Sequence, residues 1–269
     1  MNKSGYEENT MRISFIGAGR VATHLAKVLS VQHDIVDIYA PHLQASQPLA
    51  QAVGAVAVKQ LSDLNPDIDL LIIAVIDRAI ESCMQQLAHQ FSNTLIVHTS
   101  GSTPLAVMTQ YYAHTGVFYP LQTFSLERDV DWAQTPILIE TAQAADIQLL
   151  EQLAQQLSPR IYHYNSEQRL SLHLAAVFAC NFSNYCYDVA AQLLDAEQVD
   201  FSLLHPLMLE TATKATQNPP KLMQTGPAVR ADQNIIHLHQ QMLAQTKRED
   251  LEEVYQVMSN GILKRHHSD

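Results

Sequence analysis

Two glycines near the start of the chain have the spacing of a turn that binds a phosphate group. They lie in the run Gly17-Ala18-Gly19-Arg20-Val21-Ala22, which follows a short strand-like segment and opens a helical pattern. Gly17 permits the tight turn, Gly19 lets the backbone approach a pyrophosphate, and Ala22 allows close packing of the helix on the strand. The free N–H groups of the helix N-terminus would hold the pyrophosphate. We therefore predict a dinucleotide-binding turn formed by Gly17, Ala18, Gly19, Arg20 and Val21. The alternative is a tight turn that binds no ligand.

The end of the second predicted strand should face the ribose of such a dinucleotide. Asp37 lies about 20 residues after Gly17, near the usual spacing of a ribose-binding acid, but it stands inside the strand and could point elsewhere. The strand ends at Tyr39-Ala40-Pro41-His42, which holds neither an acid nor an arginine. Tyr39 and His42 are predicted to contact the cofactor, with a solvated surface histidine as the alternative for His42. This pattern leaves the cofactor open as NADP or NAD.

A loop rich in hydroxyl groups follows the fifth predicted strand. It reads Thr99-Ser100-Gly101-Ser102, and the fourth predicted strand ends near Ala74-Val75-Ile76. In a doubly wound sheet, ligands bind outside the carboxyl ends of the strands. Ala74, Val75 and Ile76 are therefore predicted to line the cofactor. The loop is predicted to hold a substrate carboxylate or carbonyl group through Thr99, Ser100, Gly101 and Ser102. A serine-rich helix cap or turn is the alternative.

Three polar residues share one face of a long helical pattern in the second half of the chain. At about 100° per residue, Asn181 and Asn184 fall near the direction of His173, among apolar neighbours. Buried polar groups need partners, and a substrate between the domains would supply them. His173 is the predicted acid, because a histidine can change its charge near neutral pH. Asn181 and Asn184 are predicted to bind substrate; hydrogen bonds to the backbone or a dimer contact are the alternatives.

One further cation could bind a substrate carboxylate. Arg230 and Asp232 follow Gly226-Pro227, so that Asp232 could cap a helix while Arg230 pairs with it or with a substrate. A purely structural role for Arg230 is the alternative. His237 and His239 are two residues apart on a helical pattern and cannot share a face, so they do not form a metal site. No other motif indicates a metal ligand set.

The order of apolar runs indicates the elements that carry these residues. Strands are predicted at 12–16, 35–40, 55–58, 70–75 and 94–98, alternating with helices at 20–30, 46–53 and 79–89. This alternation is typical of parallel βαβ units, and edge strands are expected at Val117 and Ile137–Ile139. The fold class is therefore α/β, with a doubly wound and mostly parallel sheet followed by an all-α domain.

The alternation of strand-like and helical runs stops near Pro159. Helical patterns then cover 166–194, 201–217, 232–244 and 248–263, interrupted by Pro219-Pro220 and Thr225-Gly226-Pro227. We expect a disordered extension over residues 1–10, a dinucleotide-binding domain over 11–159 and a helical domain over 160–269. The helix around Leu170–Phe182 is too apolar to be exposed on one side, which predicts a homodimer through the helical domain.

Composition excludes several classes of partner. The chain has 269 residues and a formal net charge of -11, which argues against binding to nucleic acid. No apolar run is long enough to span a bilayer, and no basic stripe indicates a membrane surface. The first residues lack the apolar core of a signal peptide, and the three cysteines have neither disulfide nor zinc spacing. A cytoplasmic location with free thiols is expected.

At this point the sequence resembles the Rossmann-like proteins that carry a DUF2520 domain, which are distant relatives of pyrroline-5-carboxylate reductase and of 6-phosphogluconate-type dehydrogenases. The resemblance covers nearly everything after Met11. The segments that carry it are 15–22, 73–77, 98–102, 119–124, 173–182 and 225–232. The family usually has arginine at the position of Pro41, proline at Ile76 and histidine at Tyr119. If that histidine acts in catalysis, Tyr119 must replace it here.

The resemblance implies an NAD(P)H-dependent oxidoreductase that is dimeric through its helical domain, and some relatives look like a type of ketopantoate reductase. Such an enzyme would reduce a small 2-oxo acid, with 2-dehydropantoate as the first candidate, or an imine. In that hypothesis His173 is the acid or the polarising group, Asn181 binds the carbonyl or carboxylate group, and Ser100 positions the substrate. The alternative is a sensor or scaffold protein that binds the dinucleotide without catalysis.

Overall fold

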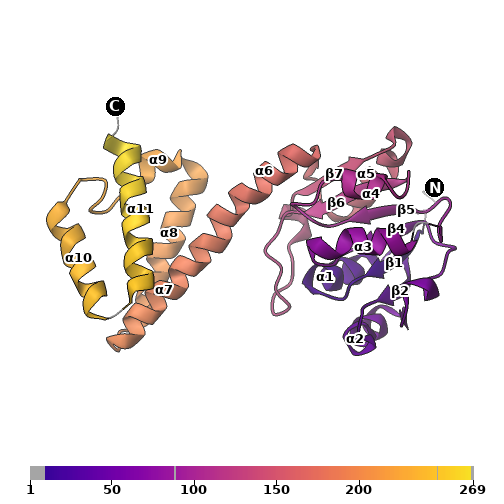
Figure 1. Cartoon of the computed structure of the whole chain (residues 1–269), viewed down its shortest axis with the longest axis horizontal. Helices are drawn as coiled ribbons and strands as arrows, with labels where there is room; N and C mark the ends of the chain where they lie inside the picture. Colours follow the sequence, from indigo (N-terminus) through magenta and orange to yellow (C-terminus); the bar gives the residue numbers. More distant parts are fainter. Residues whose placement is uncertain (1–9, 88, 247, 268–269) are drawn as a thin grey trace, which may run out of the picture. The chain divides into compact units, whose positions relative to one another are not determined.

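The computed structural model describes residues 10–87, 89–246 and 248–267, and its strands form an eight-stranded sheet (Figure 1). The strands are β1 (Arg12–Ile16), β2 (Asp34–Tyr39), β3 (Val56–Val58), β4 (Leu70–Ile73), β5 (Leu95–His98), β6 (Thr115–Pro120), β7 (Ile137–Thr141) and β8 (Ile161–His163). Their order is β3-β2-β1-β4-β5-β6-β7-β8. Every neighbouring pair is parallel except β6 and β7. The doubly wound, mostly parallel sheet predicted from the sequence is thereby confirmed.

Helices lie on both faces of this sheet and continue beyond it. They are α1 (Arg20–Leu29), α2 (Leu43–Val53), α3 (Asp77–Leu87), α4 (Ala106–Thr109), α5 (Ile147–Leu157), α6 (Ser166–Ala176), α7 (Ser183–Ala196), α8 (His205–Gln217), α9 (Pro220–Met223), α10 (Gln233–Gln245) and α11 (Glu249–His267). The helix-rich second half agrees with the predicted all-α region.

The core forms on both faces of β4. Leu70 and Ile72 pack into the cluster that includes α1, α2 and α5, whereas Leu71 and Ile73 pack into the cluster that includes α3 and α4. All four residues are completely buried. A strand covered on both faces reads as a continuous apolar run rather than an alternating one, which is why the sequence Leu-Leu-Ile-Ile predicts a central strand.

The structure corrects the sequence prediction at the far end of the sheet. Val117 and Ile137–Ile139 were expected in edge strands, but β6 and β7 are interior and β8 forms the edge. The short strand β8 and the helix α5 were not predicted. Leu150, Leu153 and Ala154 of α5 are nevertheless buried at helical spacing, so the signal for that helix was present in the sequence.

The chain separates into two compact units, one ending at Cys180 and one beginning at Asn181. The domain boundary expected at Pro159 stays a prediction. In the structure, α6 belongs to the same unit as the sheet. In the second unit, Asp232 is the N-cap of α10 and accepts a hydrogen bond from the N–H of Ile235 at 3.3 Å. The capping role expected for Asp232 is confirmed.

The long helix predicted over 166–194 is interrupted by a π-helical segment, Val177–Phe182. A π-helix closes i→i+5 hydrogen bonds and therefore takes more residues per turn than an α-helix. The uniform spacing of 100° per residue, from which His173, Asn181 and Asn184 were placed on one face, does not hold across this segment. The segment also spans the division between the two units. Helical spacing therefore does not support a common face for His173, Asn181 and Asn184.

Three findings concern the remaining expectations. The extension expected over residues 1–10 lies outside the described residues, except for Thr10. Within the described parts of the chain, no helix is both long and apolar enough to cross a membrane. Among the same residues, no group of three or more histidine, cysteine, aspartate or glutamate side chains could hold a metal ion.

Candidate functional site

The turn after β1 has a backbone that only glycine can adopt at its first position. Gly17 has a φ of +114°, and a Cβ added there would lie 2.2 Å from the carbonyl oxygen of Ala74. Its N–H donates a 2.7 Å hydrogen bond to the carbonyl oxygen of Tyr39. Gly17 therefore holds the end of β1 tightly between the ends of β2 and β4. A side chain at this position would separate the strands.

Gly19 differs from Gly17 because the space beside it is open. It occupies the N-cap position of α1, and a Cβ added there would meet no protein atom within 4 Å. No acidic residue lies in the first turn of α1, so the free N–H groups and the helix dipole favour an anion at this end. Ala22 is completely buried, as close packing of α1 on the sheet requires. These features fit the pyrophosphate of a dinucleotide.

The turn lies where the strand order reverses. β1 sits between β2 and β4, and the carboxyl ends of β1 and β4 form the place where doubly wound sheets bind ligands. Beyond β4, Ala74 is buried, Val75 is half-buried and Ile76 is 61% exposed. An exposed isoleucine at this edge is available to cover an apolar part of a cofactor.

Asp37 takes no part in this edge. It is buried, and its Oδ2 accepts hydrogen bonds from the N–H of Asn65 at 2.7 Å and from Ser14 Oγ at 3.4 Å. The carboxylate therefore serves the interior of the sheet. Tyr39 is the last residue of β2, and the exposed His42 is the N-cap of α2. No acid stands between them to repel a 2′-phosphate.

The loop after β5 is organised by hydrogen bonds within itself. Ser100 Oγ accepts from the N–H groups of Ser102 at 3.1 Å and Thr103 at 2.9 Å, which is the geometry of a serine turn cap. The N–H of Ser100 donates to Nδ1 of His98 at 3.1 Å. The N–H of Thr99 donates to the carbonyl oxygen of Ile73 at 3.2 Å. These bonds match the turn-cap alternative, and they hold the loop in one shape.

His98 is a fixed neutral part of this loop. Burial lowers the pKa of its imidazole to about 3, and the nearby positive charge of Arg169 acts in the same direction. The ring is therefore neutral at physiological pH, and its Nδ1 can accept the N–H of Ser100. At the far side of the loop, Ser102 Oγ donates a hydrogen bond to Oδ2 of Asp77, the first residue of α3.

Tyr119, His173 and Gly101 meet at the carboxyl edge of the sheet. The hydroxyl of Tyr119 and Nδ1 of His173 lie 3.1 Å apart in a hydrogen bond, and the two rings pack edge to face. A Cβ added to Gly101 would lie 2.5 Å from Nδ1 of His173 and 2.8 Å from Cζ of Tyr119. The loop therefore needs glycine at this point so that both rings can pack on its backbone.

The environment of Tyr119 keeps its phenol protonated. Burial raises the pKa of Tyr119, the charge of Arg169 opposes this effect, and the charge of Asp77 adds to it. A protonated phenol bound to an imidazole can hold a proton at the Tyr119 oxygen or pass it to the His173 nitrogen.

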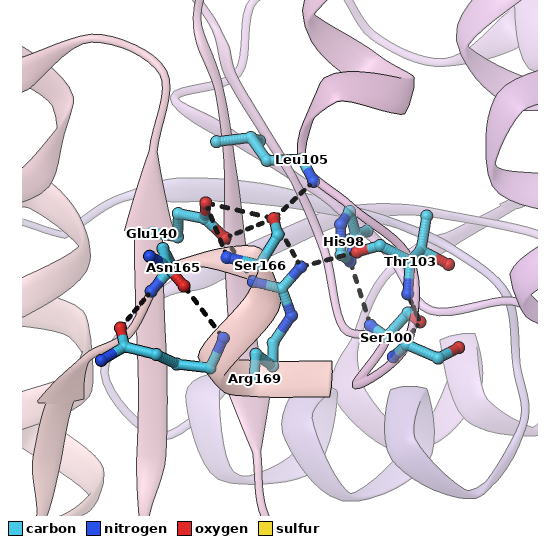
Figure 2. Close-up of polar contacts among 10 residues, drawn as sticks. His98, Ser100, Thr103, Leu105, Glu140, Asn165, Ser166 and Arg169 are labelled. Atoms are coloured by element: carbon cyan, nitrogen blue, oxygen red, sulfur yellow. Dashed lines mark hydrogen bonds and ion pairs between the residues drawn. The ribbon is translucent and has the colours of Figure 1, made fainter. Parts of the chain in front are cut away.

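A buried ion pair supports the loop from below (Figure 2). Arg169 of α6 reaches Glu140 of β7 and the carbonyl oxygen of Thr103, and Ser166 bonds to both side chains. The Arg169 side chain is only 1% exposed. This network joins β7, the first turn of α6 and the loop after β5.

The structure brings together some of the predicted site residues. Thr99, Ser100, Gly101, Ser102 and His173 gather at one edge of the sheet with Tyr119. Asn181, Asn184 and Arg230 belong to the second unit, and their roles stay predictions.

Sequence reasoning left other residues of this edge out of the site. Tyr119 was noted only as a departure from the family pattern. Asp77 begins α3 shortly after the buried strand β4, at the carboxyl edge of the sheet, which is a signal that could have identified it. His114 precedes β6 and pairs with Asp146 at 3.1 Å, at the opposite end of β6 from Tyr119.

Comparisons with known proteins match both halves of the chain. Residues 1–122 match the Rossmann-like domain, and residues 135–262 match a domain of unknown function, DUF2520. A crystal structure from Bacteroides fragilis, described as a "putative NADP oxidoreductase", is 40% identical in sequence, with a TM-score of 0.90. The match covers 96% of this chain and 100% of that one. The chain belongs to the family of Rossmann-like proteins with a DUF2520 domain.

More distant structures share the fold of this DUF2520 family. A protein from Thermotoga maritima is 20% identical, covers 95% of this chain and 98% of its own, and has a TM-score of 0.68. An imine reductase from Myxococcus stipitatus, solved with NADP+, is 16% identical, with 96% of each chain covered and a TM-score of 0.70. At these identities the likeness shows the fold alone. Among proteins of curated function, none matches the chain.

Proposed function

We propose that this chain is an NAD(P)-dependent oxidoreductase that acts on a small carbonyl or imine substrate. The observation that carries the proposal is the turn at Gly17 and Gly19. Its first glycine is imposed by a φ of +114° and by contact with Ala74, while the space beside the second is open. An unliganded tight turn would require the first feature but not the second. The relative from Bacteroides fragilis that is 40% identical, described as a "putative NADP oxidoreductase", supports the same assignment.

Residues at the carboxyl edge of the sheet would hold the cofactor. The N–H groups of the first turn of α1 would bind the pyrophosphate, together with Gly17, Ala18, Gly19, Arg20 and Val21. Tyr39 and His42 would lie at the ribose end. The exposed side chain of Ile76, with Ala74 and Val75, would cover the nicotinamide end. With no acid at the end of β2, either NADP or NAD fits.

The bound cofactor supplies a hydride to the carbon atom of a C=O or C=N bond. The negative charge that develops on the oxygen or nitrogen of that bond needs a donor and then a proton. We assign the proton to the hydrogen-bonded pair of Tyr119 and His173, whose hydroxyl and imidazole lie 3.1 Å apart. Ser100 shapes the loop beneath them. Substrate binding by Thr99, Gly101, Ser102, Asn181, Asn184 and Arg230 is part of this proposal.

A homodimer is also part of the proposal, with the helical domain as its interface. Large apolar side chains of the second unit are widely exposed in the single chain. Leu203, Leu207, Leu209 and Val257 are 69%, 62%, 70% and 72% exposed, respectively. Side chains of this size are usually covered in a stable protein, so their wide exposure favours a partner that buries them. A second copy of the chain would cover them.

The test of the function is a substrate screen. Small 2-oxo acids, beginning with 2-dehydropantoate, and cyclic imines are incubated with NADH and with NADPH, and loss of the reduced nicotinamide absorbance is followed. Turnover of one class with either cofactor supports the proposal. Tight binding of both cofactors without turnover of any compound would favour the alternative of a dinucleotide-binding sensor.

A further inference from the structure

The most deeply buried charged side chain of the described residues is that of Arg169. It lies on α6, one turn before His173, and only 1% of its surface is exposed. A buried guanidinium is costly unless its charge is paired and its N–H groups are bonded. Its partners therefore indicate what the protein gains by placing it there.

Those partners come from three separate parts of the fold (Figure 2). One terminal nitrogen of Arg169 pairs with Oε2 of Glu140 on β7. The other donates to the carbonyl oxygen of Thr103 at 2.6 Å and to Ser166 Oγ at 3.2 Å. Charge-assisted bonds of this kind are short and directional. Arg169 thus bonds to the loop after β5 through Thr103 and to the sheet through Glu140.

Ser166 and Glu140 complete the connection. Glu140 accepts hydrogen bonds from the N–H and the hydroxyl of Ser166, each at 3.1 Å. Ser166 Oγ in turn accepts the N–H of Leu105 at 3.0 Å. The first turn of α6 is therefore fixed to β7 and to the loop by the same group of side chains. A shift of any one of them would move the other two.

We propose that Arg169 is a positioning residue that, with Glu140 and Ser166, holds the Tyr119–His173 pair against Gly101. His173 is carried on α6, which Arg169 anchors, and Gly101 is carried on the loop, which Arg169 also anchors through Thr103. Tyr119 comes from β6, next to β7. Two of the three contacting groups, His173 and Gly101, thus come from segments bonded by the Arg169 guanidinium, and the third comes from the strand beside β7. That the pair transfers a proton rests on the proposed function; its positioning by Arg169 does not.

Electrostatics agree with this geometry. The positive charge of Arg169 lowers the pKa of Tyr119, against burial and the negative charge of Asp77, which both raise it. Removing the charge would leave the phenol a weaker acid. Arg169 itself makes no bond to Tyr119 or His173 among its hydrogen bonds described above, so its effect on the pair acts through position and field.

A simpler role must be separated from this one. Arg169 could serve only to neutralise the carboxylate of Glu140. Replacing only Arg169 cannot decide between the two roles, because the partly buried Glu140 carboxylate, which is 18% exposed, would lose its partner and destabilise the protein in either case. Replacing both charges can decide, because a buried ion pair exchanged for neutral side chains is often neutral for stability. The informative variant is therefore R169M/E140Q, in which the amide oxygen introduced on β7 can still accept hydrogen bonds from Ser166.

The experiment measures the contact between Tyr119 and His173 without any substrate. The full-length protein is labelled on its histidine rings, and the ring signal of His173 is followed by NMR through a pH titration. The substitution Y119F is made in the wild type, in R169M/E140Q, in R169K and in R160M. Arg160 is the matched control, because it is exposed and donates to the carbonyl oxygen of Gln134. NADPH affinity and the midpoint of thermal unfolding are measured on each protein.

In the wild type and in R160M, we expect Y119F to shift the ring-nitrogen signals of His173, because the hydrogen bond to Nδ1 is lost. In R169M/E140Q we expect a folded protein with NADPH affinity within about twofold of wild type, but with no effect of Y119F on His173. R169K should keep part of the effect, since an ammonium group retains the charge but lacks the planar fork.

A full effect of Y119F in folded R169M/E140Q would overturn the proposal. If R169M/E140Q does not fold, R169K provides the test. An undiminished effect of Y119F on His173 in R169K would also overturn the proposal. Failure of the wild type to bind either NADPH or NADH would refute the proposed function and leave the positioning result intact.

Discussion

Gly101→Ala is the substitution that tests the geometry of the site most sharply. The new methyl group would stand 2.5 Å from Nδ1 of His173 and 2.8 Å from Cζ of Tyr119. Ordinary contacts between such atoms are about 3.5–4.0 Å, so both rings must retreat by about 1 Å. A displacement of about 1 Å at a catalytic group can cost about 10²-fold in rate. Overpacking of this kind costs about 1–3 kcal/mol of stability.

We therefore expect Gly101→Ala to lower kcat/KM about 100-fold on whichever substrate the screen identifies, with unchanged NADPH affinity. Nicotinamide absorbance gives the rate, a fluorescence titration gives the affinity, and urea unfolding gives the stability. Gly261→Ala is the control, because a Cβ at Gly261 in α11 would meet nothing within 4 Å. That change should leave activity intact and add about 0.5–1 kcal/mol of stability. Wild-type turnover by folded Gly101→Ala would show that the packing of the rings on the loop does not govern the reaction.

Four further predictions address the proton donor, substrate binding, the assembly and the buried histidine. His173→Ala should lower turnover about 10²–10⁴-fold if His173 delivers the proton. Equal rates for His173→Ala and the wild type would refute His173 as the proton donor. Asn181→Ala should instead weaken substrate binding by about 1–3 kcal/mol. The chain should be a homodimer at micromolar concentration in light scattering, and a monodisperse monomer would contradict the interface. Because His98 has a pKa of about 3 in the folded protein and about 6.5 when unfolded, the unfolded state binds more protons between these values. The free energy of unfolding should therefore fall with decreasing pH below about 6.5, by up to about 1.4 kcal/mol per pH unit. His98→Asn, whose amide oxygen can accept the N–H of Ser100, should reduce that slope in urea unfolding at several pH values, and an identical slope would count against a buried neutral His98.

Most of the sheet follows from local pattern. The run Leu70–Ile73 is apolar throughout and lies at the centre of the sheet with both faces covered. Gly54, in left-handed conformation, ends α2 as the sequence suggests. The strand order at the far end could not be predicted, because β8 is short and its edge position depends on pairing with β7, about 20 residues earlier in the chain.

The site was only partly visible in the sequence, for the same reason. His173, Ser100 and Gly101 were identified from residue type and position. Arg169 was not, because an arginine in a helix is a surface residue by default and its burial depends on Glu140, which is 29 positions away. The π-helical segment was also missed, since its hydrogen bonds leave no mark in the apolar pattern.

The central claim is that the turn at Gly19 binds a nicotinamide dinucleotide, and Gly19→Val tests it most directly. A Cβ at Gly19 meets no protein atom within 4 Å, so the variant should fold, with only the small loss of stability that valine causes in place of glycine at an N-cap. Its branched Cβ would nevertheless occupy the space of the pyrophosphate. Fluorescence titration with NADPH and NADH should show binding to the wild type and none to Gly19→Val at the same concentrations. Equal affinity of a folded Gly19→Val for either dinucleotide would contradict the account.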